Sequence, residues 1–137
     1  MLLRTCLIFL FSMCFSFTVT AAEEEGEPEE EFIAYVELKT FTANYGETTE
    51  LHYVKCEITI QAGSAETEIA INEHLPSIRN DIIFLLMAQT QETMNTPTTQ
   101  TSLARQATLI VQQRLIDEVG EEASKVTDLF FVSFVAQ

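Results

Sequence analysis

The sequence has 137 residues, of which 47% are apolar and 20% charged, and its formal net charge is −14. This length allows one domain with a single core, and the apolar content excludes disorder of the whole chain. The acidic balance repels nucleic acid and anionic lipid headgroups, so we expect no nucleic-acid partner.

The first 22 residues have the order of a secretory signal peptide. One cation, Arg4, precedes an apolar run from Leu7 to Val19, and the small residues Ala21 and Ala22 follow it. The run is also close to the shortest stretch that spans a bilayer, about 17 residues. We therefore expect residues 1–22 to direct export, either as a cleaved signal peptide or as a retained N-terminal membrane anchor.

Composition divides the rest of the chain into a short linker and one domain. Residues 23–31, EEEGEPEEE, are predicted to form a solvated acidic linker because like charges repel each other. Residues 32–137 form the predicted exported domain. Cys56 is its only cysteine, so an internal disulfide is excluded and packing must supply the stability.

Two strands are predicted at the start of the domain. Residues 32–46 are rich in aromatic and β-branched side chains and end in a turn cluster, which indicates a strand leading into a hairpin connection. Residues 51–61 alternate between apolar and polar side chains, as in a half-buried strand. Its predicted core face consists of Val54, Cys56, Ile58 and Ile60.

Helical spacing of apolar residues begins at about Ala65. Pro76 interrupts it, which predicts a short helix to His74 and a longer helix from Pro76 to about Gln89. The predicted apolar stripe of these two helices consists of Ile69, Leu75, Ile78, Ile82, Leu85 and Leu86.

A third helix is predicted to follow, with Thr96 as N-cap and Pro97 at its first position. It ends at Val119, where Gly120 supplies a left-handed stop. Its predicted core residues are Leu103, Ala107, Ile110, Leu115, Ile116 and Val119.

The chain closes on a predicted strand, residues 126–137, with apolar side chains on both faces. Strict alternation puts Leu129, Phe131 and Val135 on one face and Phe130, Val132 and Phe134 on the other. Such a strand is normally central in its sheet or covered on both sides. The order strand, strand, helices, strand predicts an α+β domain: a small mixed sheet with helices packed on one face.

Candidate chemistry is sparse. His52 and Cys56 share a strand face, but four residues along a strand span about 13 Å, too far for a base to activate a thiol. Two histidines do not make a zinc site, and glycine-rich phosphate loops and nucleophile elbows are missing from the sequence. We therefore expect a non-enzymatic protein without a cofactor, a metal or a small-molecule substrate, and Cys56 as a core thiol.

Several motifs in fixed order carry a family resemblance. They are HLPSIRN at residues 74–80, a threonine-rich step into Thr-Pro at residues 90–97, and an F-x-x-F-V-x-Q ending at residues 131–137. Together with the strands at residues 35–46 and 51–61, they make the chain similar to the flagellar basal-body-associated FliL family over about residues 33–137.

This resemblance implies a flagellar motor accessory protein. Family members sit at the inner membrane with a periplasmic domain similar to the stomatin-like (SPFH) fold. They form rings around the stator and support rotation, swimming or swarming motility. The expected partners are therefore the flagellar stator complex and further copies of the chain, and the expected location is the periplasm at the basal body. The family usually begins with a basic tail and a genuine transmembrane helix, which this sequence replaces with its leader.

Five residues are candidates for an interface. Phe84, Met87 and Met94 are apolar side chains at the end of the second helical region, where methionine packs adaptably. Arg79 and Arg105 are two of the few cations that could face carboxylates of a neighbouring acidic copy. The alternative functions are a freestanding periplasmic binding or inhibitor module, such as a cystatin-type inhibitor, and an exported thiol enzyme that uses Cys56.

Overall fold

The computed structural model describes residues 31–47, 49–50 and 52–137. The predicted leader and all of the acidic linker except Glu31 lie outside the described residues. The elements are β1 (Ala34–Tyr45), β2 (His52–Ala62), α2 (Ala65–Glu73), α3 (Leu75–Met87), α4 (Gln91–Met94), α5 (Thr99–Val119), the 3-10 turn η1 (Glu121–Ala123) and β3 (Val126–Ala136). None of these helices has the length and apolar character that crossing a membrane requires.

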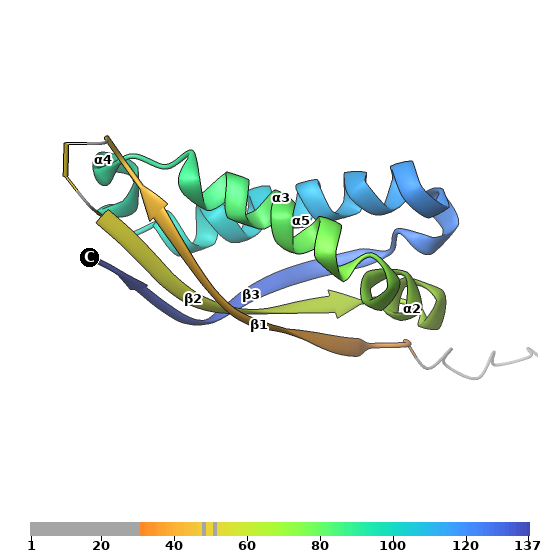
Figure 1. Ribbon diagram of the computed structural model, residues 1–137. Coiled ribbons are helices and arrows are strands. Elements are labelled where there is room, and N and C mark those ends of the chain that lie inside the picture. The colour runs from red at the N-terminus through yellow and green to blue at the C-terminus, as the bar shows by residue number, and fades with distance from the viewer. Residues whose placement is uncertain (1–30, 48, 51) are drawn as a thin grey trace, which may run out of the picture.

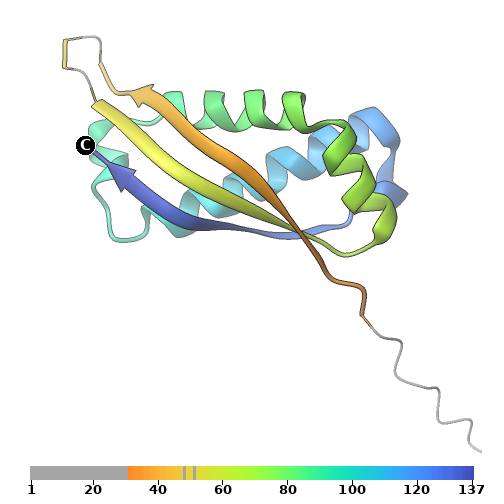
Figure 2. The same ribbon diagram turned by 60° about the horizontal axis from the view of Figure 1, so that its bottom comes forward.

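The three strands form one antiparallel sheet in the order β1-β2-β3, and the helices cover one of its faces (Figures 1 and 2). The predicted α+β class and element order are confirmed. The sheet is antiparallel throughout, however, so the prediction of a mixed sheet is wrong. The long helices α3 and α5 run out and back over the sheet, so the chain re-enters beside the end of β2 and β3 must run antiparallel to it (Figure 1).

Strand β2 is the centre of the core. Its four predicted core residues are fully buried, which confirms that face. The helices cover it with side chains spaced for one helical face: Ile78, Ile82, Leu86, Leu103, Ala107, Val111 and Leu115. This is the normal arrangement for an antiparallel sheet that has one face against helices.

Helix α2 differs from the predicted stripe. Its N-cap is Ser64, whose hydroxyl accepts a hydrogen bond from the Thr67 backbone N–H at 3.1 Å. The buried residues of the helix are Thr67, Ala70 and Ile71, so the prediction of Ile69 as a core residue is wrong and its side chain is exposed. Thr67 was not predicted because its hydroxyl is polar, but that oxygen accepts a hydrogen bond from the Lys125 N–H at 3.0 Å.

The start of α5 also differs from the prediction. The helix begins at Thr99, with Thr98 as N-cap, and Pro97 precedes it. The predicted N-cap, Thr96, instead places its hydroxyl 2.8 Å from that of Thr99, because the short helix α4 occupies the segment before it.

The buried face of α5 was predicted only in part. Its buried apolar residues recur every fourth position and include Val111, which was not predicted. The predicted core residue Val119 is exposed, and Ile110 and Ile116 are only half-buried. Gly120 ends the helix with a positive φ of 91°, which confirms the predicted stop, although its ψ of 172° is extended and not left-handed helical.

Strand β3 is an edge strand, not a central one, and its outer face is exposed. An extra residue, Val132, interrupts the pairing between Phe131 opposite Ile58 and Ser133 opposite Glu57. This β-bulge breaks the strict alternation that the sequence suggested. As a result Leu129, Phe131, Phe134 and Ala136 face the core, and Phe130, Val132 and Val135 face solvent.

We predict that truncating residues 131–137 abolishes folding. The truncation removes Phe131 and Phe134, whose rings pack edge to face against each other at 5.2 Å and lie against the core. It also removes the paired backbone bonds between Tyr53 and Gln137, at 2.8 and 2.9 Å. Urea unfolding monitored by circular dichroism is the measurement, and the expected result is that the truncated protein shows no cooperative transition. Deleting Gln137 alone is the milder control and should cost about 1–3 kcal/mol. A truncated protein that still unfolds cooperatively would show that β3 is dispensable to the fold.

Candidate interaction surface

The only cysteine among the described residues is part of the core. Burial raises the pKa of the Cys56 thiol to about 12. The nearby imidazole serves elsewhere: His52 stacks on Tyr45 at 5.5 Å, and its Nε2 lies 3.2 Å from a Glu50 carboxylate oxygen. A thiol that stays protonated is a poor nucleophile, and these contacts do not include the base that would activate it. The prediction of a core thiol is confirmed.

Within the described ranges, no three His, Cys, Asp or Glu side chains are grouped so that they could hold an ion.

Arg79 is engaged within the chain. Strand β1 carries an extra residue between Leu38 and Phe41, and this bulge turns two backbone carbonyls toward α3. The Arg79 guanidinium donates to the Lys39 carbonyl at 2.7 Å and to the Thr40 carbonyl at 3.2 Å. It also lies 4.1 Å from the centre of the Phe41 ring, a cation–π contact. Arg79 therefore attaches α3 to the edge of the sheet.

A second arginine connects the two long helices. Arg114 on α5 donates from Nε and Nη2 to both carboxylate oxygens of Asp81 on α3, at 2.7 and 2.9 Å. Its Nη1 also lies 3.5 Å from Glu118. The bidentate hydrogen bond to Asp81 raises the pKa of Arg114. This pair was not predicted, because residues 33 positions apart give no periodic signal.

The apolar candidates separate into surface and core. Phe84 and Met87 are three residues apart on α3, and 60% and 50% of their area is exposed. This spacing puts both on one face of the helix, pointing away from the sheet. Met94, the residue that ends α4, is buried in the core instead. Only the first two therefore form an apolar patch, which we call the α3 patch.

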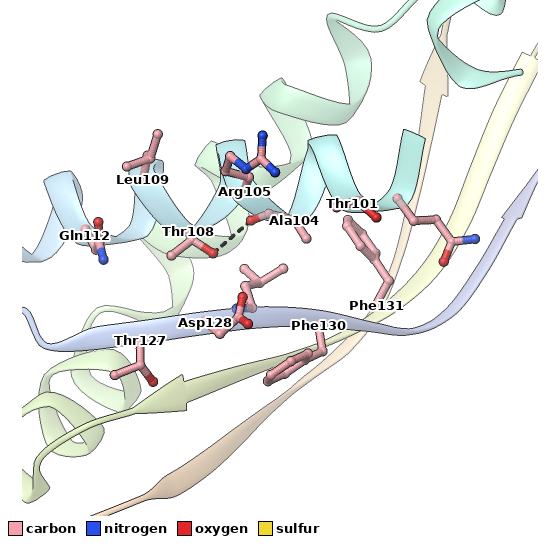
Figure 3. Close-up of a pocket in the computed structure, with 12 residues that line it drawn as sticks. Thr101, Ala104, Arg105, Thr108, Leu109, Gln112, Thr127, Asp128, Phe130 and Phe131 are labelled. Carbon is pink, nitrogen blue, oxygen red and sulfur yellow. Dashed lines mark hydrogen bonds between the residues drawn. The ribbon is translucent and has the colours of Figure 1, made fainter. Parts of the chain in front are cut away.

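A groove lies between α5 and the edge strand β3 (Figure 3). Phe131 points from β3 toward α5, whereas Phe130 points to the opposite face of the sheet. Arg105 lines the rim and extends away from β3, as does Leu109. Among the described residues, Arg105 has no carboxylate within salt-bridge distance, so its charge is available to a partner.

These features define the class of protein. The chain has a small α+β domain with a buried thiol, an exposed apolar patch on α3 and a groove beside an edge strand. These are features of an interaction domain. The sequence model of the family described as flagellar basal body-associated protein FliL matches residues 35–137. A search among curated proteins finds no match to the chain.

The family match covers well over half of the sequence, so this chain belongs to the FliL family. Membership of that family implies an accessory role at the flagellar basal body. Residues 74–80, one of the stretches on which the sequence resemblance rests, include Arg79, and the structure gives this residue a role in attaching α3 to β1. The C-terminal motif includes Gln137, whose Oε1 accepts a 2.6 Å hydrogen bond from the Tyr53 hydroxyl.

We predict that Cys56 does not react with alkylating agents in the folded protein. A pKa of about 12 leaves roughly one thiol in ten thousand ionised at pH 8. Because burial raises the pKa from its ordinary value near 9, folding favours the protonated thiol, so the free energy of unfolding should fall as the pH rises from 9 toward 12. The measurement is peptide mapping after iodoacetamide treatment, without and with urea. Rapid alkylation of Cys56 without urea would contradict the prediction.

We predict that Arg79→Met lowers the free energy of unfolding by about 1–3 kcal/mol, since two carbonyls on β1 lose a charged donor. Urea unfolding is the measurement. Arg105→Met is the matched control and should change stability by less than about 0.5 kcal/mol, because its side chain makes no such contact. Equal losses in the two variants would show that Arg79 is not a structural attachment.

Proposed function

We propose that this protein is a non-enzymatic accessory subunit of the flagellar motor that associates with the stator complex and supports rotation, swimming or swarming. The observation that carries the proposal is the family match over residues 35–137. In support, the family motifs serve to hold α3 and β3 in place, and they leave the α3 patch and the groove free for partners.

The proposal includes the arrangement of the chain. Residues 1–22 act as a signal peptide or membrane anchor, residues 23–31 as an acidic linker, and residues 32–137 as a periplasmic domain at the inner membrane. The domain would adopt a stomatin-like (SPFH) arrangement and associate with further copies in a ring around the stator. The antiparallel sheet with a single helical layer is compatible with such an arrangement.

The α3 patch is the surface that we assign to the stator. Phe84 and Met87 are large, apolar and adjacent, and aromatic residues and methionine are enriched in protein interfaces. The sequence prediction of these two residues as interface residues stays a prediction, and so does that of Arg105. Arg79 and Met94 would act indirectly, by holding α3 and α4 in place.

We predict that deleting the gene reduces the diameter of the swimming zone in soft agar, and that the wild-type gene restores it. The double variant Phe84→Ser and Met87→Ser should fail to restore it, because it removes the apolar contact area without touching the core. The matched control is Ile69→Ser with Val119→Ser, which removes two exposed apolar side chains elsewhere and should restore motility fully.

Normal motility in the deletion strain would overturn the motor role and leave the freestanding binding module as the function. Failure of both double variants to restore motility would instead overturn the assignment of the α3 patch. Immunoblotting establishes that the variants accumulate to the same level.

A further inference from the structure

The two edge strands of the sheet, β1 and β3, are protected to different extents against pairing with a further strand. At β1, the bulge and the Arg79 guanidinium occupy the Lys39 and Thr40 carbonyls. At the start of β3, the Gln112 side chain donates to the Val126 carbonyl at 2.6 Å, and Asp128 accepts the Leu129 N–H at 2.8 Å. Bulges and side-chain contacts of this kind prevent further strands from pairing with an edge.

The part of β3 that follows its bulge, residues 133–137, has no comparable protection. Among the described residues, no side chain hydrogen-bonds to the backbone of residues 130–136, in contrast to the start of the same strand. Residues 129–137, LFFVSFVAQ, contain no charged side chain and no proline. Lysine, other charges and proline are the usual means by which an exposed edge avoids pairing.

The ladder identifies the backbone groups that are free. Tyr53 and Gln137 exchange both of their backbone hydrogen bonds, and an antiparallel ladder alternates between bonded and non-bonded pairs. Val135 opposite Lys55 is therefore the next bonded pair. It follows that Phe134 and Ala136 turn their N–H and C=O groups away from β2, toward the free edge.

This edge is self-complementary. The bulge at Val132 limits the regular backbone to residues 133–137, and the midpoint of that stretch is Val135. If two copies pair antiparallel about Val135, Phe134 of each copy lies opposite Ala136 of the other. Each of these pairs can exchange both backbone bonds, with a large side chain beside a small one on the helical face.

We propose that a second copy of this chain pairs with β3 about a two-fold axis at Val135 and joins the two sheets into one antiparallel sheet. Charge favours this occupant: the protein carries −14, and two copies approach each other with least repulsion along a seam without ionisable side chains. The outward side chain of Val135, which is 47% exposed, then meets its counterpart across the axis and loses contact with water.

This pairing goes beyond the proposed function, because it needs no stator. It also differs from a ring of copies, whose head-to-tail contacts use two different surfaces, whereas a two-fold contact uses the same surface twice. The pairing is short, so we expect a weak dimer that depends on concentration.

Sedimentation equilibrium of the full chain over about 1–100 µM is the test, in mild detergent if the leader is retained. The expected result is a monomer–dimer equilibrium. Val135→Lys should raise the dissociation constant at least about tenfold, since it places two like charges together at the axis. Tyr35→Lys is the matched control: its side chain is 59% exposed on β1, and it should leave the constant unchanged. Circular dichroism establishes that both variants are folded.

A disulfide provides a second readout that does not depend on the folding of the lysine variant. With Cys6 and Cys14 replaced by serine, Val135→Cys should form a disulfide-linked dimer on mild oxidation, because facing non-bonded pairs bring Cα atoms within disulfide range. Tyr35→Cys should not form this disulfide-linked dimer.

A monomer at all concentrations, a dimer unaffected by Val135→Lys, or no cross-link through Val135→Cys would each overturn the pairing. A monomer that loses stator association with Val135→Lys would assign the edge to a strand of a partner protein instead.

Discussion

The structure depends on the pairing of the last strand, β3, with the central strand β2. Without β3, one edge of β2 would be open and its buried face would lose the cover of Leu129, Phe131 and Phe134. The pairing extends to Gln137, which exchanges both of its backbone hydrogen bonds with Tyr53. Helices α3 and α5 form an out-and-back pair over the sheet, which returns the chain to the end of β2 (Figure 1). The Arg114–Asp81 contact then fixes the two helices relative to each other.

Bulges in both outer strands lie at the same level of the sheet, beside Glu57 of β2. In β1 the bulge presents carbonyls that Arg79 binds, so an irregular strand becomes an attachment point for a helix. In β3 the bulge shifts Phe134 onto the core face and leaves Val132 outside. A β-bulge thus helps to protect the edge at β1, and in β3 it determines which side chains are exposed. Sheet edges and exposed faces of this kind are surfaces through which proteins recognise partners.

The sequence predicted elements well where periodicity is regular. Alternation located the buried face of β2, and Gly120 marked the end of α5, because both signals are local. Prediction from the sequence failed where tertiary contacts determine the local structure. Alternation in β3 was broken by a bulge, Ile69 lost its core position to Thr67, and the start of α5 shifted because the capping box of Thr90 and Thr93 formed an extra helix. The role of Arg79 could not be predicted either, since its partners are backbone carbonyls about 40 residues away that only a bulge exposes.

Family membership gives an accessory role at the flagellar basal body, and the arrangement of the surface is the basis of our proposal that the domain acts by contact with partner proteins. The most direct test is a photo-cross-linking amino acid in place of Phe84, which is exposed on α3, in swimming cells. The account predicts an adduct between this protein and a stator subunit, formed from Phe84 and not from the same probe at Ile69. Adducts of equal intensity at both positions, or adducts only with proteins unrelated to the motor, would contradict it.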